Sequence, residues 1–149
     1  MKIVMPYGIR LSADGKIEVM PVVEARIKYG DKNKTILGIF LIDSGATTTL
    51  LPSTDAQALG LMIASGVKVA VGGVTGHYLV GYRHEISLEI QGCLINRVPV
   101  VFTRNRNVPR VLGREGIFSK FTVIFDEARK RTALLDALKE EKRIEALLS

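Results

Sequence analysis

Hydrophobic and polar positions in the first third of the chain follow the pattern of β-strands. Residues 21–29 alternate loosely between apolar and polar side chains, and the polar cluster at residues 30–34 is typical of a turn between hairpin strands. Residues 35–42 are almost wholly apolar, which predicts a strand buried on both faces. Threonines followed by leucines at residues 47–51 predict another strand. Residues 43–46 would then form the loop that joins two strands.

The middle of the chain predicts a short helix and then a glycine-rich hairpin. Thr54 and Gln57 have the spacing of a helix capping box, and Gly60 suits the C-terminal end of the helix. Residues 67–71 alternate, and residues 77–80 look like the strand that returns. Glycine removes side-chain restraint on the backbone, so we expect a mobile hairpin tip. This tip contains Gly72, Gly73, Val74, Thr75 and Gly76.

The remaining segments predict more strands and a helical tail. Residues 86–90 and 98–102 are read as strands, and residues 121–135 as a hairpin around a polar turn. Residues 137–148 are rich in Ala, Leu, Lys and Glu, which favour a helix. No linker or repeat divides the chain. We therefore expect a single, mostly β domain over residues 1–149, with its core at about residues 21–136 and a helical tail at 137–149.

The composition fits an ordinary globular domain. The chain has 149 residues, of which 47% are hydrophobic and 24% are charged, enough for a core without disulfides or metals. Cys93 is the only cysteine, which fits a reducing compartment. The N-terminal residues lack the apolar stretch of a signal peptide, and no segment reaches the roughly 20 apolar residues of a membrane helix. We expect a cytoplasmic protein without membrane contact.

The net charge of +6 raises the alternative of a nucleic-acid-binding β-barrel. No aromatic stacking platform is interleaved with the basic residues, tryptophan is absent, and acidic residues interrupt the basic run. Solvated loops explain this pattern better, so nucleic acid is not the expected partner. The basic residues concerned are Arg97, Arg104, Arg106, Arg110, Arg114, Arg129, Lys130 and Arg131.

The sequence Asp43-Ser44-Gly45 is the strongest candidate for chemistry. It follows directly on the apolar strand predicted at residues 35–42, and such an arrangement can hold a carboxylate on a tight loop at the end of a rigid element. Gly45 allows a close backbone approach, and Ser44 offers a hydroxyl that can hydrogen-bond across the loop. Asp-Ser-Gly is also ordinary turn chemistry, so the local pattern alone leaves both interpretations open.

Residues 40–47, Phe-Leu-Ile-Asp-Ser-Gly-Ala-Thr, resemble the active-site signature of retroviral-type (retropepsin-like) aspartic proteases. The second landmark of that family is an apolar pair followed by glycine, and residues 111–114 (Val111, Leu112, Gly113 and Arg114) match it. Between the two landmarks the family places a glycine-rich flap, where Gly72, Gly73 and Val74 lie. The resemblance spans about residues 21–136. It implies an all-β closed barrel with a flap hairpin and one or two short helices, to which this chain adds a C-terminal helical tail.

The resemblance also implies roles for single residues. Asp43 would be the catalytic aspartate, Ser44 would brace the loop against its twin in a partner subunit, and Gly45 and Ala46 would complete the loop. Gly113 would let the strand of Val111 and Leu112 cross behind that loop. The family's mechanism uses two carboxylates that share one proton and activate a water, without metal or cofactor. Because this chain has a single Asp-Ser-Gly, the resemblance implies a homodimeric endopeptidase that acts on peptides or proteins.

Two departures from the family leave the mode of dimer contact open. The flap lacks the isoleucine-rich composition of viral examples, and the chain after Arg114 continues as a hairpin and tail in place of one terminal strand. A catalytically silent dimeric module that binds protein or peptide is the alternative function. His77 and His84 lack the H-E-x-x-H spacing of a zinc site, and no serine lies in a G-x-S-x-G elbow. We therefore predict neither a metal site nor a serine hydrolase.

Overall fold

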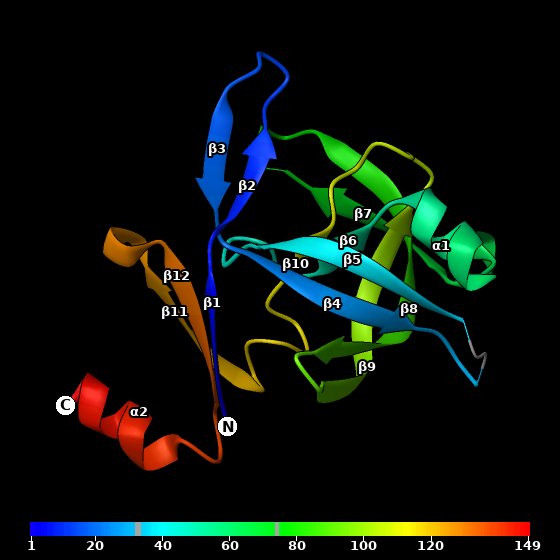
Figure 1. The fold of residues 1–149 in the computed structure, drawn as a ribbon. Helices are drawn as coiled ribbons and strands as arrows, with labels where there is room; N and C mark the ends of the chain where they lie inside the picture. The colour runs from blue at the N-terminus through cyan, green and yellow to red at the C-terminus, as the bar shows by residue number, and fades with distance from the viewer. Residues whose placement is uncertain (32–33, 74) are drawn as a thin grey trace.

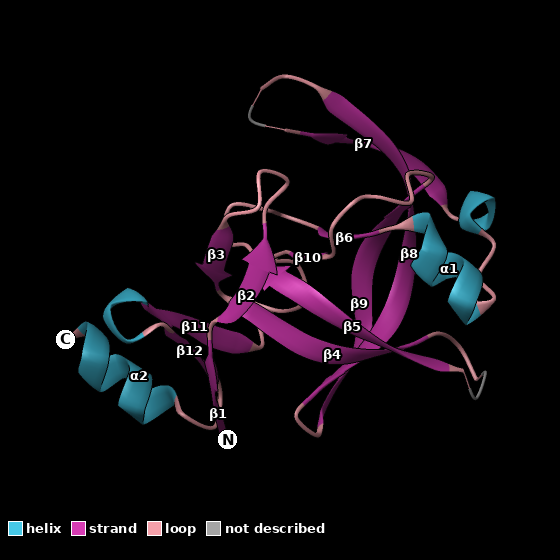
Figure 2. Ribbon diagram, turned by 45° about the horizontal axis from the view of Figure 1, so that its top comes forward, coloured by secondary structure: helices cyan, strands magenta, loops and turns pink. Residues whose placement is uncertain are grey.

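A closed barrel of six strands forms the body of the protein (Figures 1 and 2). The computed structural model describes residues 1–31, 34–73 and 75–149. Around the barrel the strands follow the order β4-β5-β10-β6-β9-β8, and antiparallel pairing of β4 with β8 closes the ring. The six strands are β4 (Val22–Lys28), β5 (Thr35–Ile42), β6 (Thr49–Leu51), β8 (Tyr78–Ile90), β9 (Cys93–Thr103) and β10 (Val111–Leu112). The predicted all-β closed barrel is confirmed.

The hydrophobic core fills this barrel. Phe40, Phe102 and Leu112 are fully buried, and Ile3 and Met5 near the N-terminus join the same cluster. Strand β5 has the predicted bounds, but the expectation that both its faces are buried is wrong. Its odd-numbered residues 37 and 39 are exposed, because a barrel strand turns every second side chain outward and no other part of the described chain covers this face. The predicted turn at residues 30–34 includes residues 32 and 33, which lie outside the described part.

Helix α1 (Ser53–Leu59) packs against the barrel through Ala56 and Leu59. It begins after Pro52 without a side-chain cap, so the predicted capping box is wrong. The predicted C-terminal end is confirmed, because Gly60 adopts the left-handed conformation with a φ of 67° and its N–H donates to carbonyls in the last turn. A 3₁₀ turn, η1 (Ile63–Ser65), follows.

Strand β7 (Val67–Gly72) leaves the barrel as one arm of the expected flap hairpin and pairs with the first half of β8. At the tip, the N–H of Gly73 donates to the carbonyl of His77 at 2.9 Å, and Gly76 has a φ of 76°. Figure 2 shows this hairpin projecting beyond the barrel. The hairpin is confirmed, its mobility stays a prediction, and Val74 lies outside the described residues.

A second, three-stranded sheet lies beside the barrel in the order β1-β12-β11. The hairpin of β11 (Phe121–Asp126) and β12 (Arg131–Asp136), joined through η2 (Glu127–Arg129), was predicted. The antiparallel addition of β1 (Lys2–Pro6) to β12 was not predicted. The tail is helical over α2 (Glu141–Leu148) only, because Asp136 accepts hydrogen bonds from the N–H groups of Leu138 and Lys139 and holds the start of the tail in turns.

The first 20 residues contain one further element without a sequence prediction. Strands β2 (Gly8–Leu11) and β3 (Ile17–Met20) form a separate two-stranded sheet that projects from the body (Figure 1). Neither helix in the described ranges is long or apolar enough to cross a membrane.

Candidate active site

Asp43 lies where β5 ends, on a loop whose geometry is fixed by backbone hydrogen bonds. Its N–H donates to the carbonyl of Leu112 at 3.1 Å, and its own carbonyl accepts from the N–H of Ala46 at 3.2 Å. The N–H of Gly45 donates to Oδ1 of the Asp43 carboxylate at 2.8 Å. The carboxylate is half-buried, and Ser44 beside it is exposed. A Cβ on residue 45 would lie 3.2 Å from Oδ1 of Asp43, which is a tight contact. Glycine at this position avoids that contact with the carboxylate.

Strand β10 lies between the two strands that carry this loop. Val111 and Leu112 pair in parallel with residues 41 and 42 of β5, and Val111 also pairs antiparallel with Leu50 of β6. The sequence brings this about because a short apolar pair fits between two buried strands and the following glycine permits the crossing. The second predicted landmark therefore lies directly behind the first.

Gly113 makes the closest approach in this crossing. A Cβ at this position would lie 2.5 Å from the backbone carbon of Thr48, a distance that real structures do not show. The N–H of Gly113 donates to Oγ1 of Thr49 at 3.0 Å, in a buried position. The next two N–H groups, of Arg114 and Glu115, donate to carbonyls at residues 46 and 47, each at 2.9 Å. The structure thus brings the two sequence-predicted motifs together as one hydrogen-bonded unit.

An ion pair next to this unit was missed by the sequence analysis. Arg83 of β8 and Glu115 pair through both guanidinium nitrogens, with the longer contact at 3.2 Å. The hydrogen bond from Arg83 holds the pKa of Glu115 below its ordinary value, and the same contact raises the pKa of Arg83. Thr48 also donates to Glu115 at 3.4 Å. The only available signal was the position of Glu115 directly after the second landmark, because its partner is 32 residues away.

The sequence analysis also missed a second ion pair, at the other end of β10. Asp55 of α1 is 3% exposed and accepts two hydrogen bonds from Arg110, at 2.6 and 2.7 Å. This bidentate pair raises the pKa of the Arg110 guanidinium and fixes the chain directly before β10. The Arg110 side chain also lies over Gly38, where a Cβ would meet it at 2.8 Å. Asp55 therefore connects α1 to β10, in addition to its position in the first helical turn.

A cavity of about 400 Å³ lies between the Asp43 loop and the flap hairpin. Residues 45–48 form one wall, residues 69–72 of β7 form another, and Arg83 and Val101 complete it. Gly72, which the sequence analysis assigned to the flap, is among the residues that line this cavity. A peptide lying in it would contact the loop that carries Asp43, and such concave sites beside a fixed carboxylate are typical of enzymes.

The basic residues that suggested nucleic-acid binding are largely paired with carboxylates. Arg97 contacts Glu85 at 3.0 Å, Arg110 contacts Asp55, and Arg131 contacts Asp126 at 2.8 Å. These pairs reduce the field that the positive charges present to an anionic partner. Within residues 1–31, 34–73 and 75–149, no group of three or more His, Cys, Asp or Glu side chains could hold a metal ion.

A closed barrel with an aspartate loop, a strand crossing behind it and a covering hairpin defines the class of retropepsin-like aspartic proteases. Residues 29–116 match the family model described as "gag-polyprotein putative aspartyl protease". This match covers more than half of the chain, and the chain belongs to that family.

Among solved structures, the chain is similar to a retropepsin-like aspartic protease from Rickettsia conorii, with a TM-score of 0.62 and 16% sequence identity. That likeness covers 90% of this chain and 89% of the other, and at this identity it shows a shared fold. EIAV protease complexed with the inhibitor HBY-793 matches with a TM-score of 0.48 and 20% identity, over 64% of this chain and 82% of that one. No curated protein matches the sequence.

Proposed function

We propose that the chain is an aspartic endopeptidase that works as a homodimer, with Asp43 of each copy supplying one carboxylate of a shared active site. The observation that carries this proposal is the position of Asp43: a half-buried carboxylate, held by the N–H of Gly45, on a loop that lines a cavity under a hairpin. Membership of an aspartyl protease family supports the same reaction class.

The mechanism needs two carboxylates close enough to share one proton. The ionised carboxylate removes a proton from a water as that water attacks the peptide carbonyl, and the protonated one donates toward the developing oxyanion. Residues 43–46 hold the first carboxylate in place. Ser44, which is exposed beside it, would contact the loop of the partner.

Among the residues that the structure describes, the carboxylates beside this loop are already paired. Glu115 is paired with Arg83, and Asp55 is paired with Arg110. The hydrogen bond from Arg83 lowers the pKa of Glu115, which opposes proton sharing between Glu115 and Asp43. The sequence contains no second Asp-Ser-Gly or Asp-Thr-Gly. A two-fold axis that brings two Asp43 loops together is the simplest way to complete the site.

The decisive variant is Asp43→Asn, which is nearly isosteric. Peptide cleavage should fall by roughly 10²–10⁴-fold or more, because both halves of the acid–base pair are lost, while the fold survives. Asp31→Asn, the same change at an exposed turn at the other end of β5, is the matched control and should cleave like wild type. The wild-type rate should be bell-shaped in the acid range, because one carboxylate must be ionised and one protonated.

Mixing tests the shared site directly. At a fixed concentration of wild type, an equal amount of Asp43→Asn should lower activity to about half, because half of the wild-type chains then sit in mixed dimers with one aspartate. An equal amount of Asp31→Asn should not lower it. Unchanged activity with the Asp43 variant would mean that each chain works alone. Peptide binding by wild type without cleavage at any pH would favour the silent binding module.

A further inference from the structure

The β2–β3 hairpin, here called the arm, is an element without a role in the site described so far. Its two strands pair only with one another and belong to neither the barrel nor the three-stranded sheet. The arm is connected to the rest of the chain through β1 on one side and β4 on the other. Figure 1 shows it extending away from the barrel.

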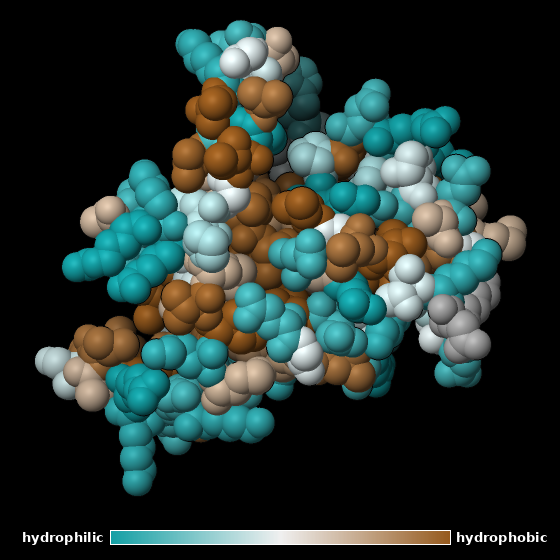
Figure 3. All heavy atoms as spheres, in the orientation of Figure 1, coloured by the Kyte–Doolittle hydropathy of each residue, from teal (hydrophilic) through white to brown (hydrophobic). Residues whose placement is uncertain are grey.

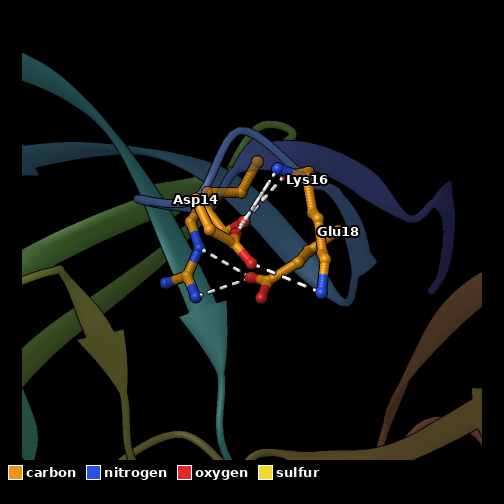
Figure 4. Close-up of polar contacts among 5 residues, drawn as sticks. Asp14, Lys16 and Glu18 are labelled. Atoms are coloured by element: carbon orange, nitrogen blue, oxygen red, sulfur yellow. Dashed lines mark hydrogen bonds and ion pairs between the residues drawn. The ribbon is translucent and has the colours of Figure 1, made fainter.

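The polar side chains of the arm are satisfied within the arm. Arg10 and Glu18 face one another across the two strands and form an ion pair at 2.7 Å. In the turn, Ser12 donates to Asp14, and Lys16 lies 3.4 Å from the carboxylate of Asp14. Figure 4 shows Asp14, Lys16 and Glu18 in these contacts. The charges therefore need no outside partner.

The opposite face of the arm is wholly aliphatic. Ile9 pairs with Val19 and Leu11 pairs with Ile17, and alternation along the strands places all four side chains on the face away from Arg10. Their exposed fractions are 74% for Ile9, 71% for Leu11, 67% for Ile17 and 47% for Val19. In Figure 3 hydrophobic residues cover part of the arm and continue onto the body below it.

An exposed face of this kind implies an occupant. The four residues present on the order of 500 Å² of apolar surface, which is within the range for the largest patch on a typical monomer and is often functional. A two-stranded hairpin without packing on one face is only marginally stable in water. Covering the apolar face would both remove this surface from water and stabilise the hairpin.

The location of the arm identifies the occupant. The carbonyl of Pro21, directly after β3, accepts a hydrogen bond from the N–H of Ile42 at 2.9 Å, one residue before Asp43. Ile9 of the arm lines one groove together with Ile39 and Leu41 of β5. The base of the arm is therefore close to the end of β5, which leads into the Asp43 loop. In Figure 1 the arm and the end of β5 that leads into that loop lie on the same side of the barrel.

We propose that the arm packs through Ile9, Leu11, Ile17 and Val19 against a second copy of this chain, beside the two paired Asp43 loops. This inference rests on the proposed homodimer and adds the surface that holds it. Each partner contributes about 800 Å² to an interface of standard size, so the arm supplies more than half of that area and the loops supply much of the rest. The arm's apolar face bears no charge that would select a nucleic acid or a charged peptide.

The test compares lysine substitutions on and off the arm. Ile9→Lys and Ile17→Lys each place a charge where the contact must exclude water, so each should raise the dimer dissociation constant about tenfold or more. Met62→Lys, at a residue 75% exposed in the segment between α1 and η1, is the matched control and should change it less than about twofold. Sedimentation equilibrium over a range of protein concentrations gives the constants.

Hydrogen exchange on wild type gives a second measurement that needs no variant. Backbone amides of β2 and β3 should exchange more slowly above the dimer dissociation constant than below it, because covering the apolar face stabilises the hairpin. Equal exchange rates in monomer and dimer would overturn the proposal, whether or not the lysine variants fold.

The outcomes separate this inference from the proposed function. If wild type dimerises and cleaves while both arm variants dimerise equally well, the arm is not the interface and the protease assignment stands. If the arm variants dimerise normally but raise KM, the arm contacts substrate and the proposal is overturned. A wild type that stays monomeric at high micromolar concentration with peptide present overturns both.

Discussion

The close approach of Gly113 to the Asp43 loop makes Gly113→Ala a sharp test of the site's architecture. The added Cβ would lie 2.5 Å from the carbon, 2.7 Å from the oxygen and 2.9 Å from the nitrogen of the Thr48 backbone. All three are main-chain atoms, so no rotation of a side chain relieves the overlap. The neighbouring backbone is also held in place, because the N–H of Glu115 donates to the carbonyl of Thr47.

The size of the effect follows from these contacts. Overpacking a core usually costs about 1–3 kcal/mol, and a clash with fixed backbone belongs at the upper end of that range, about 3 kcal/mol. In a domain of this size each kcal/mol lowers Tm by about 2–4 °C, so we expect a fall of about 6–12 °C. Relief requires β10 or the loop to move, and either movement disturbs the hydrogen bond from Asp43 to Leu112. Activity should therefore fall even at temperatures where the variant is folded.

Thermal unfolding at a single protein concentration measures this cost, since the proposed dimerisation would make Tm depend on concentration. Gly73→Ala in the flap is the matched control: the nearest atom to its added Cβ is 3.5 Å away, an ordinary contact. Its stability should stay within about 0.5 kcal/mol of wild type. A Gly113→Ala protein that melts within about 2 °C of wild type would refute the crossing of β10 behind the loop, given that a real overlap costs at least 1 kcal/mol.

The two ion pairs beside the site give two more predictions. Asp55→Asn leaves the Arg110 charge unpaired and should cost about 2–3 kcal/mol, below the usual 3–5 because Arg110 is partly exposed. Glu85→Gln, at an exposed pair that water screens, should cost only a small fraction of this. Equal losses in urea titrations would contradict this difference. Because Arg83 lowers the pKa of Glu115, their contribution is present above the ordinary carboxyl pKa of about 4.3 and is lost as pH falls through the lowered value. The stability gap between wild type and Glu115→Gln should therefore be present at neutral pH and should close as the pH falls through the lowered pKa of Glu115; a gap independent of pH would rule out the ion pair as its cause.

Sequence reasoning succeeded where the information is local. Three features of the site could be predicted because each depends on neighbouring residues only. They are the apolar run before Asp43, the glycine after Ser44 and the apolar pair before Gly113. The flap hairpin and the hairpin of β11 and β12 were predicted for the same reason, since alternation and turn residues lie next to one another in sequence.

The missed features depend on partners that are distant along the chain. Asp55 lies in the first turn of α1, and nothing near it in the sequence pointed to Arg110, 55 residues away. The pairing of β1 with β12 joins the two ends of the chain, which no local pattern predicts. Strand β5 was expected to be buried on both faces because its residues are almost all apolar. An apolar run alone does not distinguish a strand face that is covered within the chain from one that is exposed. Leu37 and Ile39 are apolar and exposed, and in this respect they resemble the arm.

The exposed apolar residues and the single Asp43 carboxylate support the same proposal about assembly. Everything that orients one Asp43 is supplied within the chain: the N–H of Gly45, the carbonyl of Leu112 and the contacts made by residues 113–115. Beside this loop, the two carboxylates discussed above among the described residues, Glu115 and Asp55, are each paired with an arginine. On the same side the chain presents aliphatic surface that costs free energy in water. A single association would supply a second carboxylate and cover the surface together. The monomer should consequently be folded but inactive, with cleavage rising as the square of chain concentration well below the dimer dissociation constant.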